Sequence, residues 1–254
     1  MKPTVELKQA LKTLNLTEAA QVVEQHLMEA EQAQWTCREF LERMLHYELA
    51  RREEKQLARR YKWASFPEMK TLDEFRLEEQ PSLSKRQFQQ LRELLWLEQN
   101  YNLILLGPPG VGKTHLAIGL GVEALKKGYK VSFVTMDTLI HLLKTQLISR
   151  SSQYKVKRLL NSDLVIVDDL MFMAMDRNEA NLFFQLINKL YGQTSIILTS
   201  NKGPEDWGEL LGDQAITTAI LDRILHKSEV VQLSGDSYRL KYRQTIFQGI
   251  PCSI

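Results

Sequence analysis

Residues 103–114 read Leu-Ile-Leu-Leu-Gly-Pro-Pro-Gly-Val-Gly-Lys-Thr, an apolar run that breaks into a glycine-rich turn ending in Lys-Thr. Glycine adopts backbone conformations that other residues resist, so successive N–H groups of such a turn can point at one anion. An apolar strand before the turn and a helix after it, extending to Gly128, complete the pattern of a phosphate-binding loop. In that pattern Lys113 reaches the β- and γ-phosphates of a nucleotide, and the Thr114 hydroxyl binds Mg²⁺. The predicted nucleotide-binding residues are Gly107, Pro108, Pro109, Gly110, Val111, Gly112, Lys113 and Thr114.

Length and composition allow two domains. The chain has 254 residues, enough for one α/β domain and a smaller accessory domain, and its net charge of +2 is too small to indicate a nucleic-acid partner by itself. Cys37 and Cys252 lie near opposite ends of the chain, which favours reduced thiols over a disulfide framework. No stretch has the length and apolar character of a signal peptide or a membrane span. We therefore expect a soluble, cytoplasmic protein without a membrane partner.

The N-terminal part of the sequence predicts a helical domain. Between residues 4 and 63 glycine and proline are nearly absent, and apolar residues recur at helical spacing. Thr36 and Glu39 form the pattern of a capping box at the start of a third helix, whose expected buried stripe is Phe40, Leu41, Met44, Leu45 and Leu49. Irregular sequence with two prolines follows residue 65. We predict an all-helical domain over 1–65 that binds DNA or a partner, and an ATPase domain over 66–254.

Two clusters of basic residues are candidates for contacts with DNA. Cations in such clusters can neutralise the phosphates of a nucleic acid, but they also occur as solvated surface, and the sequence leaves both interpretations open. Contact with a partner protein is a further alternative for the first cluster. The first cluster is Arg51, Arg52, Lys55, Arg59 and Arg60, and the second is Lys144, Arg150, Lys155, Lys157 and Arg158.

The remaining sequence alternates between strand and helix patterns. Apolar strands are expected at 129–135, 164–167, 195–201 and 230–233, with helices between them. Ser84, Asp137 and Asn178 are the expected N-caps of helices, the first of which should continue through Leu97. This alternation predicts an α/β fold, a mostly parallel sheet sandwiched by helices.

Polar residues follow two of these strands. Asp168 and Asp169 end a fully apolar strand, and Asn201 ends the next one along the chain. Because parallel strands place ligands outside their carboxyl ends, we expect these side chains at the phosphate site. Asp168 would hold Mg²⁺, Asp169 would polarise the attacking water, and Asn201 would orient that water or contact the γ-phosphate. Arg223, on a later helix, is able either to form an internal salt bridge or to enter a neighbouring subunit's site.

The motifs together resemble a known class of ATPases. GPPGVGKT at 107–114, VIVDDL at 165–170, LTSN at 198–201 and LDRI at 221–224 are similar in order and spacing to the AAA+ class, within its DnaA/DnaC-like branch. The chain most resembles the IstB family, ATP-binding helpers of insertion-sequence transposition. That likeness includes ARRYKWASFPEMKTLDEF at 58–75 and GDSYR at 235–239. The resemblance implies a Walker A pair of Lys113 and Thr114, a Walker B pair of Asp168 and Asp169, Asn201 as sensor 1 and Arg223 as arginine finger.

The resemblance also implies a function. We expect an ATPase with ATP and Mg²⁺ as cofactors that oligomerises on duplex DNA and assists an IstA-type transposase in target selection or strand transfer. Hydrolysis should be slow, because Asp169 stands where many AAA+ proteins have the longer Glu, and it should be stimulated by assembly, DNA or the transposase. A DnaC-like helicase loader is the alternative, and a small-molecule kinase is a more remote one. The tail after Arg223 is too short for a full helical lid, so Arg239 is not placed in the catalytic set.

Overall fold

A computed structural model describes residues 3–170, 175–209 and 214–242. The chain divides into two compact units, Met1–Arg60 and Tyr61–Ile254. Cys252, one of the two cysteines discussed above, lies outside the described residues, whereas Cys37 is exposed as a free thiol. None of the described helices is both long enough and apolar enough to cross a lipid bilayer.

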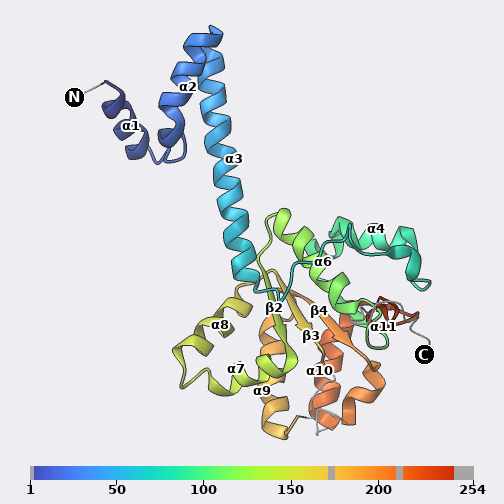
Figure 1. Cartoon of the computed structure of the whole chain (residues 1–254). Helices are drawn as coiled ribbons and strands as arrows, with labels where there is room; N and C mark the ends of the chain where they lie inside the picture. The colour runs from blue at the N-terminus through green and yellow to red at the C-terminus, as the bar shows by residue number, and fades with distance from the viewer. Residues whose placement is uncertain (1–2, 171–174, 210–213, 243–254) are drawn as a thin grey trace, which may run out of the picture. The chain divides into compact units, whose positions relative to one another are not determined.

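The first unit is built from three helices (Figure 1). They are α1 (Pro3–Thr13), α2 (Ala19–Ala33) and α3 (Cys37–Ala64), the last of which continues into the second unit. The Thr36–Glu39 capping box is confirmed, because each residue's side chain bonds the other's backbone N–H. Met44 packs with Ala19 and Val23 in a small apolar core.

The expected buried stripe of α3 is only partly correct. Met44 is buried and Phe40 packs against the same core, but Leu41, Leu45 and Leu49 are exposed. These three leucines recur every four residues, one position after Phe40 and Met44, so they lie on a neighbouring face of the helix. The sequence pattern did not show which of the two adjacent apolar rows would be covered.

The second unit contains a five-stranded sheet in the order β2-β3-β4-β1-β5, and every neighbouring pair is parallel. The prediction of an α/β fold with a parallel sheet is confirmed. Side chains of β1, β3 and β4 are buried along their whole length, as expected for central strands covered on both faces. The strands are β1 (Asn102–Leu106), β2 (Val131–Thr135), β3 (Leu164–Asp168), β4 (Ser195–Ser200) and β5 (Ser228–Gln232).

Helices cover both faces of this sheet (Figure 1). Ile166 contacts α6 at Gly121, whereas its neighbours Val165 and Val167 belong to the apolar cluster formed with α7, α9 and α10. Because successive strand residues point to opposite faces, α6 lies on one face and this cluster on the other. The α-helices of this layered unit are α6 (Lys113–Lys126), α7 (Met136–Thr145), α8 (Arg150–Leu160), α9 (Arg177–Leu190) and α10 (Gln214–His226).

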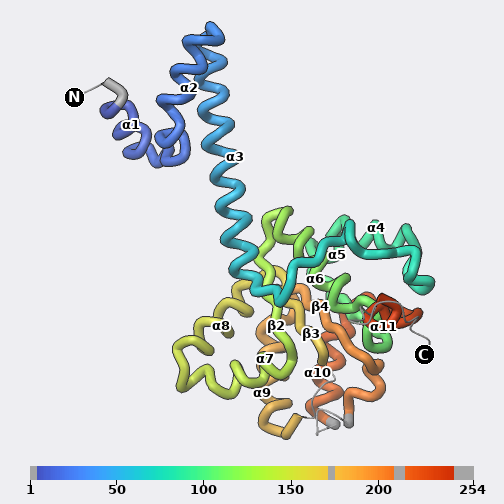
Figure 2. Tube along the Cα trace, in the orientation of Figure 1, coloured from blue at the N-terminus to red at the C-terminus, as the bar shows by residue number. Residues whose placement is uncertain are grey.

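The segment between α3 and α4 runs along α6 (Figure 2). Leu72 packs against Gly119 and Phe66 packs against Gly121. An added Cβ at Gly119 would collide with the leucine side chain, and one at Gly121 would collide with the phenylalanine ring. Phe75 stacks on Phe88, with ring centroids 5.7 Å apart. The segment holds the short helix η1 (Leu77–Glu79) and is followed by α4 (Lys85–Glu93) and α5 (Leu95–Glu98); η2 (Pro204–Glu209) and α11 (Tyr238–Lys241) complete the described helices.

Three local expectations need correction. Ser84 does cap α4, but the helix ends at Glu93, since Leu94 takes a left-handed conformation with φ of 61°. That turn redirects the chain and buries both Leu94 and Leu97. The caps of α7 and α9 are Thr135 and Asp176, not Asp137 and Asn178. At α9 the cap Asp176 forms a complete capping box with Glu179, whereas Asn178, two residues later, already lies within the helix.

Candidate functional site: a phosphate loop at the carboxyl edge of the sheet

The glycine-rich turn connects β1 to α6 at the carboxyl edge of the sheet. Gly107 and Gly110 have positive φ angles of 148° and 85°. A Cβ at Gly107 would lie 2.2 Å from the carbonyl oxygen of Leu233, and one at Gly110 would lie 2.1 Å from Ser237 Oγ. Both positions therefore require glycine, for conformation and for the close approach of the chain after β5.

Lys113 is buried beneath this loop. Its amine donates hydrogen bonds to the carbonyl oxygens of Gly107 at 2.7 Å and Pro108 at 2.9 Å, and to Asn201 Oδ1 at 2.7 Å. Burial lowers the pKa of Lys113, while Asp169 and Asp168 act in the opposite direction. The structure thus brings together the predicted Walker A lysine and the predicted sensor.

Thr114 and Asp168 form the second part of the site. The Thr114 hydroxyl donates to Asp168 Oδ1 at 2.9 Å, and the Thr199 hydroxyl donates to the same oxygen at 2.6 Å. Burial raises the pKa of Asp168, and the bond from Thr199 partly offsets that effect. A hydroxyl and a carboxylate side by side are hard oxygen donors, which suit Mg²⁺.

Asp169 differs from Asp168 in its surroundings. It is exposed, has a positive φ of 55°, and its backbone N–H donates to Thr199 Oγ1 at 2.9 Å. A left-handed conformation is uncommon outside glycine, although Asp tolerates it better than most residues. Because of the bend after β3, the carboxylate of Asp168 is buried beside Thr114, whereas that of Asp169 lies at the cavity wall.

These residues open onto a cavity of about 650 Å³, a volume in the usual range for small-molecule sites. The phosphate loop, Lys113, Thr114, Asp169 and Asn201 line one part of it. The other part is lined by residues that the sequence did not assign to the site. They are Glu68, Lys70, Glu74, Phe75, Arg76, His115, Tyr238, Arg239 and Tyr242.

A clasp holds the chain after β5 against this cavity. Glu79 accepts hydrogen bonds from Lys241 Nζ at 2.8 Å and from the Tyr242 hydroxyl at 2.5 Å. The Tyr238 backbone N–H donates to the Gly110 carbonyl, which joins α11 directly to the phosphate loop. Arg239 therefore faces the nucleotide cavity without a full helical lid. The polar GDSYR turn was the sequence signal that could have placed Arg239 at this cavity.

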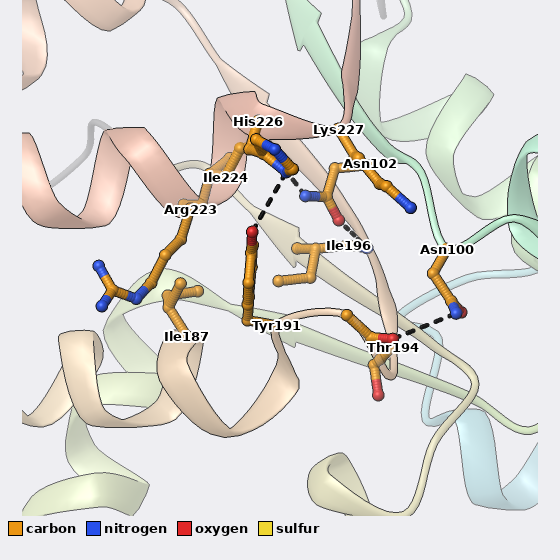
Figure 3. Close-up of a pocket in the computed structure, with 11 residues that line it drawn as sticks. Asn100, Asn102, Ile187, Tyr191, Thr194, Ile196, Arg223, Ile224, His226 and Lys227 are labelled. Carbon is orange, nitrogen blue, oxygen red and sulfur yellow. Dashed lines mark hydrogen bonds between the residues drawn. The ribbon is translucent and has the colours of Figure 1, made fainter.

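Arg223 lies at the opposite edge of the sheet. It lines a cavity of about 300 Å³ together with Asn102, Thr194 and Lys227, which lie at or just before the starts of β1, β4 and β5 (Figure 3). Its guanidinium donates to Asn188 Oδ1 at 2.5 Å and to the Ala219 carbonyl oxygen at 2.8 Å. These contacts place Arg223 at the amino edge, away from the phosphate loop of its own chain.

Most of the first basic cluster is paired within the N-terminal unit. Arg51 pairs with Glu54 at 2.6 Å, Arg52 with the buried Glu48 at 2.6 Å, and Lys55 with the buried Glu18 at 2.5 Å. Arg59 and Arg60 form no ion pair with a described residue.

The second basic cluster is divided. Lys144 pairs with Glu179 at 2.8 Å, and Arg158 is half-buried with a hydrogen bond to Ser65 at 3.1 Å. Arg150, Lys155 and Lys157 are exposed and have no ion pair with any residue in the described part of the chain. The structure therefore separates cations with a local partner from cations that remain available to an anion.

Comparison with protein families adds the identity of the chain. The model of the family described as IstB-like ATP binding protein matches residues 9–246. The chain belongs to this family. A protein named for ATP binding in insertion sequence IS21 of Pseudomonas aeruginosa is 41% identical over 239 residues, which cover 94% of this chain and 90% of that relative. The expected IstB resemblance is thereby confirmed.

Solved structures place the fold among AAA+ P-loop domains, as expected. AMPPCP-bound DnaA from Aquifex aeolicus matches with a TM-score of 0.54 and 26% identity, covering 69% of this chain and 53% of DnaA. DnaA bound to AMPPCP and single-stranded DNA matches with a TM-score of 0.53 and 25% identity over the same shares of the two chains. The chain thus spans about half the length of DnaA. It is a nucleotide-binding AAA+ protein of an insertion-sequence family.

Proposed function

We propose that the protein binds Mg²⁺ and ATP in the 650 Å³ cavity, assembles as an oligomer on duplex DNA, and assists an IstA-type transposase. Hydrolysis of ATP to ADP and phosphate is slow and depends on assembly, so that the nucleotide acts mainly as a switch. The observation that carries this proposal is the convergence of Lys113 on Asn201 and of Thr114 on Asp168 around the phosphate loop.

The nucleotide step uses residues already in place. The γ-phosphate replaces the loop carbonyls as acceptor for Lys113, while Asn201 stays within reach of the same amine. Thr114 and Asp168 would hold Mg²⁺, which would supply positive charge to offset the negative charge of the phosphates. Asp169 polarises the attacking water, and the Asp carboxylate has a shorter reach than Glu, which supports slow turnover.

The assembly step uses Arg223. Its position at the amino edge keeps it from its own phosphate loop, so it serves a neighbouring subunit's nucleotide. In the free chain its guanidinium is bonded to Asn188, a contact that assembly exchanges for phosphate oxygens. This exchange makes hydrolysis dependent on a neighbour.

DNA binding is supported by charge and by relatives. Arg59, Arg60, Arg150, Lys155 and Lys157 have no ion pair with a described residue, and cations of this kind bind nucleic acid through its phosphates. The solved DnaA structure holds single-stranded DNA together with AMPPCP, and the P. aeruginosa relative is named for an insertion sequence. The likeness to DnaA supports a nucleic acid as a partner of this chain, and the relative's name supports a role beside the transposase of an insertion sequence; duplex DNA is the form that we propose.

Phosphate release tests the proposal directly. We expect slow release of phosphate from ATP by the protein alone, and faster release when duplex DNA and the cognate transposase are added together. The Lys113→Ala variant should release none under either condition. Transfer of phosphate to a small-molecule acceptor, in place of free phosphate, would contradict the proposal and indicate a kinase.

A further inference from the structure

A second cavity, of about 210 Å³, lies in the Tyr61–Ile254 unit, apart from the nucleotide site. It is formed between the segment after α3, the end of β2, and helices α7 and α8. Its lining combines two cations with three hydroxyl groups over an apolar floor, and no acidic side chain is among them. The lining residues are Ser65, Pro67, Phe133, Val134, Thr135, Thr138, Leu142, Lys155, Arg158 and Leu159.

Arg158 is the central residue of this cavity. Its Nη1 donates to Ser65 Oγ at 3.1 Å, and its guanidinium carbon lies 6.0 Å from the ring centroid of Trp63. The buried Nε–H of Arg158 finds no acceptor among the described residues, and neither does the buried Nε1–H of Trp63. Arg158 is half-buried and forms no ion pair with a described residue, so a bound anion would satisfy the unpaired Nε–H and balance the charge of the guanidinium.

The charged side chains around the cavity do not supply this anion. Lys155 lines the same cavity, is exposed, and forms no ion pair with a described residue. The nearest carboxylate on the adjoining helix is Asp137, which accepts a hydrogen bond from the Thr135 hydroxyl and does not line the cavity. Burial also lowers the pKa of Arg158, consistent with a guanidinium that lacks a compensating carboxylate.

We propose that this cavity binds one phosphate group, and that its source is a phosphodiester of the duplex DNA backbone. The planar guanidinium matches phosphate oxygens, and the Lys155 amine and the Thr138 hydroxyl supply further donors. The volume accommodates a tetrahedral anion and is smaller than usual drug-sized sites. The identification of DNA as the source of the phosphate rests on the DNA binding proposed above. The proposal that the cavity binds a phosphate group does not depend on it.

The salt dependence of duplex binding tests this proposal. The logarithm of the affinity falls with the logarithm of salt concentration, and each neutralised phosphate contributes about 0.9 to the slope. Arg158→Gln, which removes the cation that holds the phosphate, should reduce the slope by about 0.9, and Lys155→Gln, which leaves Arg158 in place, should reduce it by less. Arg158→Lys keeps the charge and should keep the slope. The matched control is Lys189→Gln, which removes an exposed lysine of α9 outside the cavity and should change nothing.

A second measurement separates the two sources of phosphate. Inorganic phosphate is added to protein saturated with Mg²⁺ and a non-hydrolysable ATP analogue, against chloride at equal ionic strength. Phosphate stabilises folded proteins in general by exclusion from their surface, so the effect of the site is the additional rise in melting temperature of the wild type over that of Arg158→Gln, which we expect to be positive. If this holds but no duplex binds in any nucleotide state, the cavity is a phosphate site and DNA as its source is refuted. The whole inference would be overturned if the slope is unchanged in both Gln variants and phosphate has no effect at the site in the wild type. If Arg158→Gln fails to fold, Lys155→Gln keeps the test valid.

Discussion

Lys113 shows how the surrounding loop satisfies the hydrogen-bonding capacity of a buried cation. Its amine satisfies its hydrogen-bonding capacity with two carbonyls of its own loop and with Asn201. A buried charge without these partners would be costly, so the loop conformation and the lysine stabilise one another. Binding of a phosphate then exchanges one set of acceptors for a better, charged one.

The first prediction concerns this lysine. Lys113→Ala should weaken ATP binding by about a hundredfold, since a hydrogen bond to a charged group contributes about 1.5–3 kcal/mol. Titration with a fluorescent ATP analogue measures the loss, and Lys189→Ala, an exposed lysine on α9, is the control. Unchanged ATP binding in Lys113→Ala would show that the nucleotide binds elsewhere.

The second prediction follows from Asp168. Burial raises the pKa of this carboxyl above its ordinary value of 3.8, and only the ionised form binds Mg²⁺. As the pH falls, Asp168 takes up its proton at a higher pH than an exposed aspartate, so the Mg²⁺-dependent part of ATP affinity should decline early on the acid side. Measuring ATP affinity with and without Mg²⁺ across that range gives the profile. The Asp168→Asn variant should lack the Mg²⁺-dependent part at every pH, and a wild-type profile in Asp168→Asn would contradict the assignment.

At the scale of elements, the chain after β5 forms part of the wall of the nucleotide cavity. Glu79 in η1 binds Lys241 and Tyr242, and α11 bonds to the phosphate loop through Gly110. Since Arg239 and Tyr242 line the nucleotide cavity, this clasp positions part of its wall. Nucleotide binding and the order of α11 should therefore be coupled.

The third prediction tests that coupling. Glu79→Gln removes the carboxylate that Lys241 and Tyr242 share, so nucleotide affinity should fall a few-fold and the C-terminal segment should be cleaved faster by protease. Added ATP should slow the cleavage of the wild type more than that of the variant. The neighbouring Glu78→Gln removes an exposed carboxylate and is the control. Equal cleavage and affinity in both variants would show that the clasp has no role.

Most elements could be predicted from local sequence, because strands buried on both faces and capped helices have distinct patterns. The phosphate loop and the carboxylates after β3 could be placed together because parallel strands end at one edge. Arg76 and Tyr238 could not be assigned to the site, since their contacts join parts of the chain far apart in sequence, as in the bond from the Tyr238 hydroxyl to the Arg76 carbonyl. The turn at Leu94 was missed for a related reason: burial of the leucine, a tertiary effect, outweighs its helical preference.

At the scale of the whole molecule, the nucleotide and the proposed arginine finger lie at opposite edges of one sheet. Under the proposed function, a single chain would not complete its own site, and full hydrolytic activity would be a property of the assembly. This arrangement predicts how a mixture of two inactive variants should behave.

The fourth prediction uses such mixtures. Arg223→Ala should retain ATP binding and lose hydrolysis, whereas Lys113→Ala should lose binding but keep its arginine. Mixing the two should restore part of the activity, because an Arg223→Ala subunit with bound ATP receives the arginine of a Lys113→Ala neighbour. Phosphate release from the mixture, compared with each variant alone, is the measurement. No recovery at any ratio, or loss of ATP binding in Arg223→Ala, would assign Arg223 a structural role.

The central claim is that ATP switches assembly on duplex DNA. Size-resolved binding of the wild-type protein to random-sequence duplex, with ATP, with ADP and without nucleotide, tests it most directly. We predict defined oligomers on the duplex with ATP only, which weaken as salt is raised. Absence of duplex binding in all three states would contradict the account and favour a protein partner, such as a replicative helicase, in place of DNA.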